Sequence, residues 1–449
     1  MNPRPPGTFF GHPAGLGFIV FTEAWERFSF YGMQALLVLY MATYLLHPGT
    51  IEHVAGFAAV QRAVEAVFGS LSIQALATQL FGIYVGLIYL TPVFGGLLGD
   101  RILGRTPAVL LGAVLMAAGH FLMALESAFL FALLALIVGS GLLKGNLAAQ
   151  VGGLYEKGDQ RRDSAFSIYN VAINLGAAAA PLVCGTLGEL YGWHYGFGVA
   201  GFGMLIGIVI YLKGRKYLPP DQVRRGQGTR PKLQPGDGAV IAAVLVLILI
   251  AALFWATQAQ VWNTYPLWVK GRVAREIFGL LVPVTWFQSI DSLAVLVLAP
   301  LVLLLWSRQA KKGTEPGDFS KIILGCSIYS AAFLWLALGE NMAGGNQVNL
   351  VYPVLFHFIL GVGFMYVGPI MMSLISRAAP PAVNAMMVGS YYLSIFAGGF
   401  ISGWLGRFYE VLSPAQFWLV HAAIVGVGAV LVVLVRRPFT RLLQFPRGE

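Results

Sequence analysis

The sequence predicts an all-α integral membrane protein with twelve transmembrane helices, and three observations lead to that prediction. Charged residues make up only 11% of the 449-residue chain and AVILMFWYC residues 57%, whereas an ordinary soluble domain has about 25% charged residues. Apolar runs such as "AVIAAVLVLILIAALFWA" recur from end to end, and about 20 such residues in a helix cross a bilayer. The basic residues also gather on alternate connecting segments, as in multi-pass membrane proteins.

The apolar segments can be counted along the chain. The first lacks a small-residue cleavage site after a short apolar core, so we expect a retained helix rather than a signal peptide. We predict spans at 15–45, 76–99, 106–125, 128–152, 163–189, 194–213, 238–264, 278–306, 320–340, 348–376, 382–408 and 414–436.

The net charge of +10 follows the membrane topology. If both termini are cytoplasmic, most Lys and Arg residues fall on the inner side, including Lys213 through Lys232 and the tail from Arg436. This asymmetry predicts a multi-pass protein of the cell (inner or plasma) membrane with both termini in the cytoplasm. We therefore expect contact with anionic membrane lipids and no binding of nucleic acid.

A polar segment divides the chain. "KGRKYLPPDQVRRGQGTRPKLQPGDG" is basic and rich in proline and glycine, which predicts a linker. The expected domains are an N-terminal six-helix bundle at 1–213, a cytoplasmic linker at 214–237, and a C-terminal six-helix bundle with its tail at 238–449. Weakly similar sequence segments recur in the same order in the two halves, and one such pair aligns Tyr169 with Tyr391. Such a parallel repeat resembles the arrangement of major facilitator transporters.

The first span carries three charges in the stretch "FTEAWERFSFYG". Glu23, Glu26 and Arg27 have the spacing of one helical face, and Tyr31 continues that face about a turn further on. Charges inside a bilayer are expensive and indicate function. A structural ion pair is the alternative, but such a pair needs one acid and one base, and here a second carboxylate remains.

Two further charges fall inside predicted spans. Lys144 in "GSGLLKGNLAAQ" lies at the middle of the fourth span between glycines, which permit close helix approach; a lysine that reaches out to the headgroups would lie near a span end. Asp291 in "VTWFQSIDSLAVLV" has no basic residue in its own helix. It must find a partner elsewhere or be protonated, and an acid held by hydroxyls and water is the structural alternative.

Three amide side chains, Asn174, Gln260 and Gln288, also lie inside spans, where they can line a polar cavity and contact a substrate there, or bond neighbouring helices. We find no phosphate-binding loop, no His/Cys cluster with metal-ligand spacing and no nucleophile–base set. We therefore expect neither an enzyme nor a metal or other cofactor. Transport would have to draw on an ion gradient.

These residues carry a resemblance to a family. "EAWERFSFYG", "GLLKGN", "FSIYNVAINLGA", "FWATQAQ" and "TWFQSID" followed by "LAPLVLLLW" resemble the signatures of the proton-dependent oligopeptide transporters, the POT or PTR family. The resemblance implies a major facilitator fold and proton symport of di- and tripeptides by alternating access. It assigns proton coupling to Glu23, Glu26 and Lys144. It assigns the substrate carboxylate to Arg27 and Lys144, and the pocket to Tyr31 and Asn174.

The chain departs from that pattern on the side that would bind a peptide amino group. Phe364 stands where the family has a tenth-helix glutamate, and Asp291 replaces the eighth-helix asparagine. Gln34 and Ala259 replace an arginine and its acidic partner, so both members of a salt bridge are absent. The linker is also too short and polar for the two extra helices of many bacterial members.

The departures leave three hypotheses open. In the first, the substrate is a small peptide or peptide-like compound, and Asp291 takes the place of the missing glutamate. In the second, the substrate is a non-peptide small carboxylate, and Phe364 gives it apolar contact. In the third, the protein is a membrane sensor that transports nothing. We expect a monomer that binds a carboxylate-bearing small molecule and protons.

Overall fold

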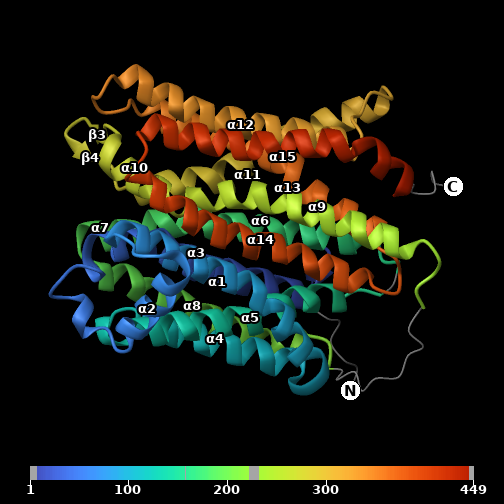
Figure 1. Ribbon diagram of the computed structural model, residues 1–449. Helices are drawn as coiled ribbons and strands as arrows, with labels where there is room; N and C mark the ends of the chain where they lie inside the picture. Colours follow the sequence, from blue (N-terminus) through green and yellow to red (C-terminus); the bar gives the residue numbers. More distant parts are fainter. Residues whose placement is uncertain (1–7, 157, 222–231, 444–449) are drawn as a thin grey trace. The chain divides into compact units, whose positions relative to one another are not determined.

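The computed structural model describes residues 8–156, 158–221 and 232–443, and long helices dominate it (Figure 1). Twelve helices of this described part are long and apolar enough to cross a membrane, which confirms the predicted number. They run Ala14–Leu45, Ile73–Leu103, Arg105–Leu122, Glu126–Gly153, Arg161–Leu190, Trp193–Tyr217, Asp237–Arg272, Thr285–Lys311, Asp318–Ala343, Val351–Ala378, Met386–Tyr409 and Pro414–Leu442.

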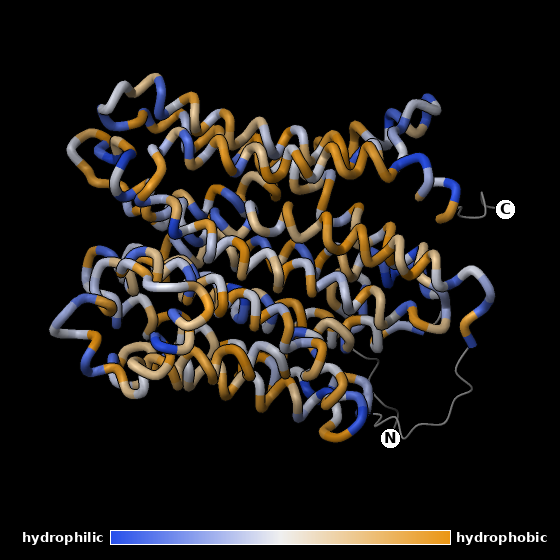
Figure 2. Tube along the Cα trace, viewed as in Figure 1, coloured by the Kyte–Doolittle hydropathy of each residue, from blue (hydrophilic) through white to orange (hydrophobic). Residues whose placement is uncertain are grey.

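Several spans join an α-helix to a short π or 3₁₀ turn. The α-helices before the polar linker are α1 Ala14–Tyr40, α2 Phe57–Phe68, α3 Ile73–Leu98, α4 Arg105–Leu122, α5 Phe129–Gly153, α6 Arg161–Ala180, α7 Thr186–Leu190 and α8 Trp193–Gly214. Those after it are α9 Asp237–Gln258, α10 Thr264–Arg272, α11 Thr285–Lys311, α12 Asp318–Ala343, α13 Val351–Ala378, α14 Asn384–Gly406 and α15 Pro414–Leu442. Apolar residues run along the helices, and many polar ones lie at the turns (Figure 2).

Two small antiparallel hairpins lie outside the spans. Strand β1 (Thr8–Phe9) pairs with β2 (His12–Pro13), and β3 (Glu276–Ile277) pairs with β4 (Leu280–Leu281). The second hairpin corrects the predicted start of the eighth span at 278, because α11 begins only at Thr285. The turn between β3 and β4 has positive φ at Phe278 and Gly279, and a helix cannot pass through such a conformation.

The chain divides into two compact units, which we call the first unit (Met1–Ser70 and Leu87–Gln227) and the second unit (Leu71–Gly86 and Gly228–Glu449). The early part of α3 thus groups with the second unit, although the sequence placed all of 1–213 in one bundle. Glycines explain the grouping: a Cβ on Gly82 of α3 would lie 2.4 Å from the Gly399 oxygen of α14.

Within each unit the long helices pack side by side. In the first unit α1 packs on α6 and α8, and α4 packs on α5 and α8. In the second unit α12 packs on α13 and α15, α9 packs on α14 and α15, and α11 packs on α13. These pairings place α1 and α6 against each other, and α11 against α13. Both pairs carry residues that the sequence singled out.

The predicted linker contains a well-anchored residue, Asp221. Asp221 Oδ1 accepts hydrogen bonds from the Thr106 backbone N at 3.0 Å and from Thr106 Oγ1 at 3.2 Å. This carboxylate therefore satisfies an amide at the start of α4, where helices leave such donors unpaired and favour negative charge. Residues 222–231 of the linker lie outside the described residues. From 215 to 236 the described part contains one 3₁₀ turn, Arg215–Tyr217, and no α-helix.

Candidate functional site

The three charges predicted on the first helix lie together inside the first unit. Glu23 is 1%, Glu26 0% and Arg27 7% exposed on α1. Arg27 Nε donates a hydrogen bond to Glu23 Oε1 at 2.7 Å and lies equally close to Glu26 Oε2. One guanidinium thus faces two carboxylates, so this helix by itself carries an uncompensated negative charge.

Lys144 of α5 supplies a second positive charge. It is close enough to Glu23, Glu26 and Arg27 to interact electrostatically with all three. Its Nζ is buried and has no hydrogen-bond partner among the described residues. The ammonium instead lies 3.7 Å from the ring centroid of Phe30, within the range of a cation–π contact. The four charged groups sum to zero, and Glu23, Glu26 and Lys144 each keep at least one buried polar atom without a hydrogen-bond partner among the described residues.

Glycines place Lys144 deep in the first unit. A Cβ on Gly95 of α3 would come within 2.1 Å of the Gly141 oxygen of α5, and a Cβ on Gly141 would lie 2.7 Å from Thr91 Cβ. The two helices therefore touch backbone to backbone one turn before the lysine, as small residues allow in membrane helices. Tyr89, on the same stretch of α3, brings its ring centroid to 5.2 Å from Lys144 Nζ.

A second close approach brings α6 to the charges of α1. A Cβ on Gly176 would lie 2.3 Å from the Ala24 oxygen and 2.9 Å from Arg27 Cβ. Tyr169, buried two turns earlier on α6, is among the electrostatic neighbours of Arg27. The glycine therefore sets how closely α6 covers the arginine and its carboxylates.

This packing predicts that Gly176→Ala destabilises the protein, because the added methyl overlaps the backbone of α1. We expect a loss of about 1–3 kcal/mol, as for other overpacked sites. Gly198→Ala on α8 is the matched control, since a Cβ there meets nothing within 4 Å and alanine favours a helix. Thermal unfolding in detergent measures both. Equal melting temperatures for the two variants would contradict the close approach.

Tyr31 and Asn174, the other residues that the resemblance assigned to this pocket, have different surroundings. Tyr31 is half-buried and is an electrostatic neighbour of Arg27. Asn174 Nδ2 donates to the Asn170 oxygen of its own helix at 2.9 Å. The structure thus groups Tyr31 with the charges, while the amide hydrogen of Asn174 is engaged within α6. The substrate role of both stays a prediction.

The two glutamines of the second unit bond to neighbouring segments. Gln260 Nε2 donates to the Ser402 oxygen of α14 at 3.0 Å, and Gln260 Oε1 accepts from the Thr264 backbone N at 3.3 Å. Gln288 Nε2 of α11 lies 3.5 Å from the Val261 oxygen. These bonds tie the turn after α9 to α14 and α11. The predicted contact of the glutamines with substrate remains a prediction.

Phe364 of α13 lies in a group of aromatic rings. Its centroid is 6.2 Å from that of Trp255 and 6.4 Å from that of Phe254, both on α9. Trp255 Nε1 donates to the hydroxyl of Tyr391 on α14 at 3.2 Å. Where the family resemblance placed a glutamate, the second unit therefore presents a half-buried aromatic surface.

Asp291 of α11 has a partner that the sequence did not reveal. His357 Nδ1, on α13, lies 3.7 Å from Asp291 Oδ1.

The sequence alone did not identify three site residues, Tyr169, Tyr89 and His357. Only Tyr169 had a signal in the sequence, its alignment with Tyr391 between the two halves. An aromatic residue by itself gives none, because such residues are common in membrane helices. Among the described residues, no group of three or more His, Cys, Asp or Glu side chains could hold a metal ion.

Comparison with known proteins identifies the family of this chain. A family model described as the POT family matches residues 106–226 and 236–419. Peptide transporter YePEPT of Yersinia enterocolitica subsp. palearctica serotype O:3 is 28% identical, with 98% of this chain and 97% of that protein covered. A di-/tripeptide transporter of Lactococcus lactis subsp. cremoris is 26% identical, with 97% of each covered.

A solved structure extends the likeness to the fold. The crystal structure of a mutant of peptide transporter POT in complex with alafosfalin superposes with a TM-score of 0.86 at 28% identity, and 98% of each chain is covered. The family match spans more than half of this chain and includes both halves. The predicted family membership is therefore confirmed: this membrane protein belongs to the POT family.

Proposed function

We propose that this protein is a proton-coupled symporter of di- and tripeptides or peptide-like compounds that works by alternating access, and not an enzyme. The balanced cluster of Glu23, Glu26, Arg27 and Lys144 is the observation that carries the proposal. Relatives named as peptide and di-/tripeptide transporters support it. The charge distribution supports a place in the cell membrane with both termini cytoplasmic.

Charge balance explains how a proton would accompany the substrate. The charges of two acids and two bases cancel within the cluster, and an uncompensated charge in a buried site costs several kcal/mol. A substrate carboxylate that binds Arg27 and Lys144 adds one negative charge. The cluster returns to neutrality if one glutamate takes up a proton. Carboxylate and proton therefore favour each other's binding, which is thermodynamic linkage.

Glu26 suits the proton-accepting role best. It is fully buried, and neither of its carboxylate oxygens has a hydrogen-bond partner among the described residues. Glu23 differs, because its Oε1 accepts the hydrogen bond of Arg27 Nε. When a substrate carboxylate draws Arg27 and Lys144 toward itself, Glu26 loses the compensation for its charge. The protonated form of the Glu26 carboxyl group then has a lower free energy than the ionised form.

Uptake into proteoliposomes with an acid-outside gradient tests the substrate class. A labelled dipeptide is offered beside its C-terminal amide and a simple monocarboxylate. We expect the dipeptide to accumulate and the amide, which has no carboxylate for Arg27 and Lys144, to fail. Accumulation of the monocarboxylate alone would favour the non-peptide hypothesis, which the aromatic surroundings of Phe364 make the second candidate. No uptake of any compound would favour a sensor.

Asp291 gives a more specific prediction, because we propose that it binds the substrate amino group. Asp291→Asn should raise the KM for dipeptides about 10-fold or more, the loss expected when a charge-assisted hydrogen bond is removed. N-acetylated dipeptides, which lack the ammonium, should be unaffected. Glu276→Gln in the exposed hairpin β3–β4 is the matched control. Unchanged dipeptide kinetics in Asp291→Asn would rule out the amino-group role.

A further inference from the structure

A buried histidine faces the carboxylate of Asp291 inside the second unit. The His357 side chain is fully buried, while the Asp291 side chain keeps 13% of its surface exposed. The 3.7 Å between His357 Nδ1 and Asp291 Oδ1 is short enough for an ion pair but too long for a good hydrogen bond. Nδ1 has no hydrogen-bond partner among the described residues. The nitrogen is therefore aimed at a carboxylate that it does not yet bond.

The other ring nitrogen of His357 is engaged by Tyr265 of α10. Nε2 lies 3.0 Å from the Tyr265 hydroxyl, and that hydroxyl also lies 3.4 Å from the Pro353 oxygen. The Tyr265 hydroxyl can donate to Nε2 or accept from it, and either bond keeps Nε2 engaged. Nδ1 is left facing the carboxylate of Asp291.

Rigid packing fixes this arrangement. The ring of Tyr265 lies edge-on to the imidazole, with centroids 5.1 Å apart, and Phe356 packs against it at 5.2 Å. The imidazole is thus held by contacts on α10 and α13, while Asp291 approaches from α11. A ring held in this way keeps Nδ1 directed at the carboxylate.

No other titratable group described in the second unit forms an ion pair with Asp291 or His357. No Lys or Arg of the described residues forms an ion pair with Asp291. Tyr265 of α10 and Tyr329 of α12 are its electrostatic neighbours. Several other groups on α12, α14 and α15 are engaged elsewhere: Glu340 with Trp268 and Arg272, Tyr391 with Trp255 and the Gly368 oxygen, and His421 with the Phe417 oxygen. Cys326 of α12 is an electrostatic neighbour of Tyr329.

We propose that Asp291 and His357 form a proton-binding site in the second unit, separate from the glutamates of α1. One proton from water binds the neutral imidazole, so that both ring nitrogens carry hydrogen; Nδ1–H then donates to Asp291 Oδ1 and Nε2–H to the Tyr265 hydroxyl. The proton turns a neutral imidazole beside a carboxylate into an ion pair, which is strong where little water is present. Histidine is the side chain that makes such a change near neutral pH.

The site reaches beyond the proposed function, since it binds a proton whatever the chain transports. The site also shares one residue, Asp291, with the proposed substrate site. A substrate ammonium at Asp291 and a proton at His357 would compete for the same carboxylate. Acidic conditions would then weaken amine binding in the second unit while they favour carboxylate binding in the first.

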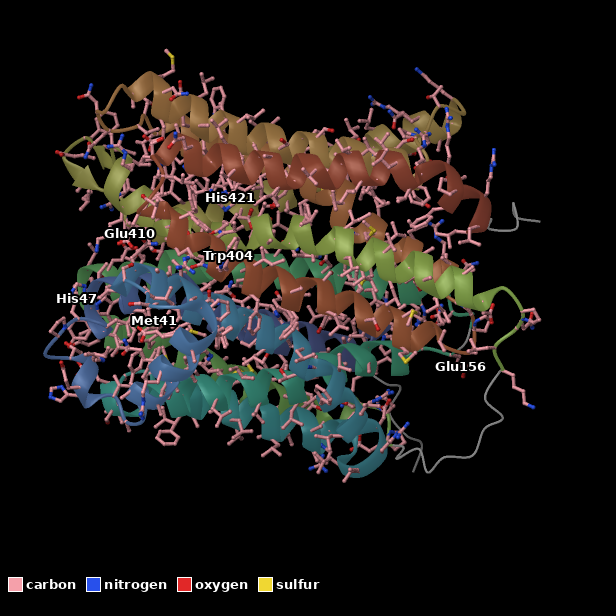
Figure 3. The ribbon with its side chains drawn as sticks, in the orientation of Figure 1. Met41, His47, Glu156, Trp404, Glu410 and His421 are labelled. Carbon is pink, nitrogen blue, oxygen red and sulfur yellow. The ribbon has the colours of Figure 1, made fainter. Side chains whose placement is uncertain are left out.

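Nitrogen NMR of the full-length protein tests the proposal without any substrate. The histidines are labelled with ¹⁵N and followed in detergent between about pH 4 and pH 9, the range that brackets an ordinary histidine. The His357 signals are assigned by their loss in His357→Gln. Should that variant fail to fold, Tyr265→Phe identifies them, because it removes the hydrogen-bond partner of Nε2. His421→Gln, on α15 (Figure 3), is the control that removes a different buried histidine.

We expect the imidazole of His357 to gain a proton as the pH falls, so that both ring nitrogens carry hydrogen at the acid end of the range. Asp291→Asn should move that titration to lower pH by about one unit or more, the effect of removing an opposite charge at this distance. His421→Gln should leave it in place. A His357 signal that does not titrate, or one that titrates identically in Asp291→Asn, would overturn the proposal. Neither result would bear on peptide uptake, so the proposed function is tested separately.

Discussion

Glu26→Gln is expected to abolish accumulation of a labelled dipeptide against its gradient while leaving exchange of dipeptide across the membrane intact. Glutamine has the shape of the buried carboxylate but cannot take up a proton. The cluster of Glu23, Arg27 and Lys144 that remains carries one net positive charge. A substrate carboxylate then neutralises it without a proton, so binding persists and coupling is lost.

Two assays on the same proteoliposomes separate these effects. Accumulation is measured under an acid-outside gradient, and exchange is measured with equal dipeptide concentrations on both sides. Glu65→Gln on α2 is the matched control, because that glutamate contacts only Gln61 of its own helix in the hydrogen bonds described. Accumulation by Glu26→Gln at the wild-type level would show that the proton is carried elsewhere.

Lys144→Ala is expected to reduce dipeptide uptake about 10- to 100-fold. This is the range that follows from losing one charge-assisted bond to a carboxylate. The variant also leaves the cluster with one net negative charge, which repels an anionic group. Exchange should fall together with accumulation, and this distinguishes the lysine from Glu26. Radiolabelled uptake at several substrate concentrations measures the loss.

Lys213→Ala on α8 controls for the loss of a lysine in general, because its side chain is exposed. The C-terminal amide of the dipeptide gives a second control, since it has no carboxylate for Lys144 to bind. Whatever residual binding the amide shows should be equal in wild type and Lys144→Ala. A dipeptide KM unchanged by Lys144→Ala would remove the lysine from the substrate site.

The charged half of the site could be predicted because each of its residues stands out within a single short segment of the sequence. Glu23, Glu26 and Arg27 share one face of a single helix, and a charge within an apolar span is rare enough to stand out. Lys144 followed from the same rule, and its flanking glycines indicated close packing. The twelve spans are equally local, since each is a run of apolar residues of sufficient length.

The second unit could be predicted only in part, because its contacts join distant segments. Nothing near Asp291 in the sequence points to His357, and a single histidine in an apolar helix usually indicates packing. The bonds of Gln260 and Gln288 depend in the same way on which helices meet. The sequence predicts the start of a helix where the hairpin β3–β4 lies, because "EIFGLLVP" is apolar and a positive φ cannot be read from composition.

Accumulation of a labelled dipeptide in proteoliposomes, with and without a protonophore, tests most directly whether a proton gradient drives transport. Under an acid-outside gradient we predict an internal dipeptide concentration above the external one, which falls to the external level when the protonophore collapses the gradient. Equal dipeptide levels with and without the protonophore would contradict proton coupling through the cluster of Glu23, Glu26, Arg27 and Lys144.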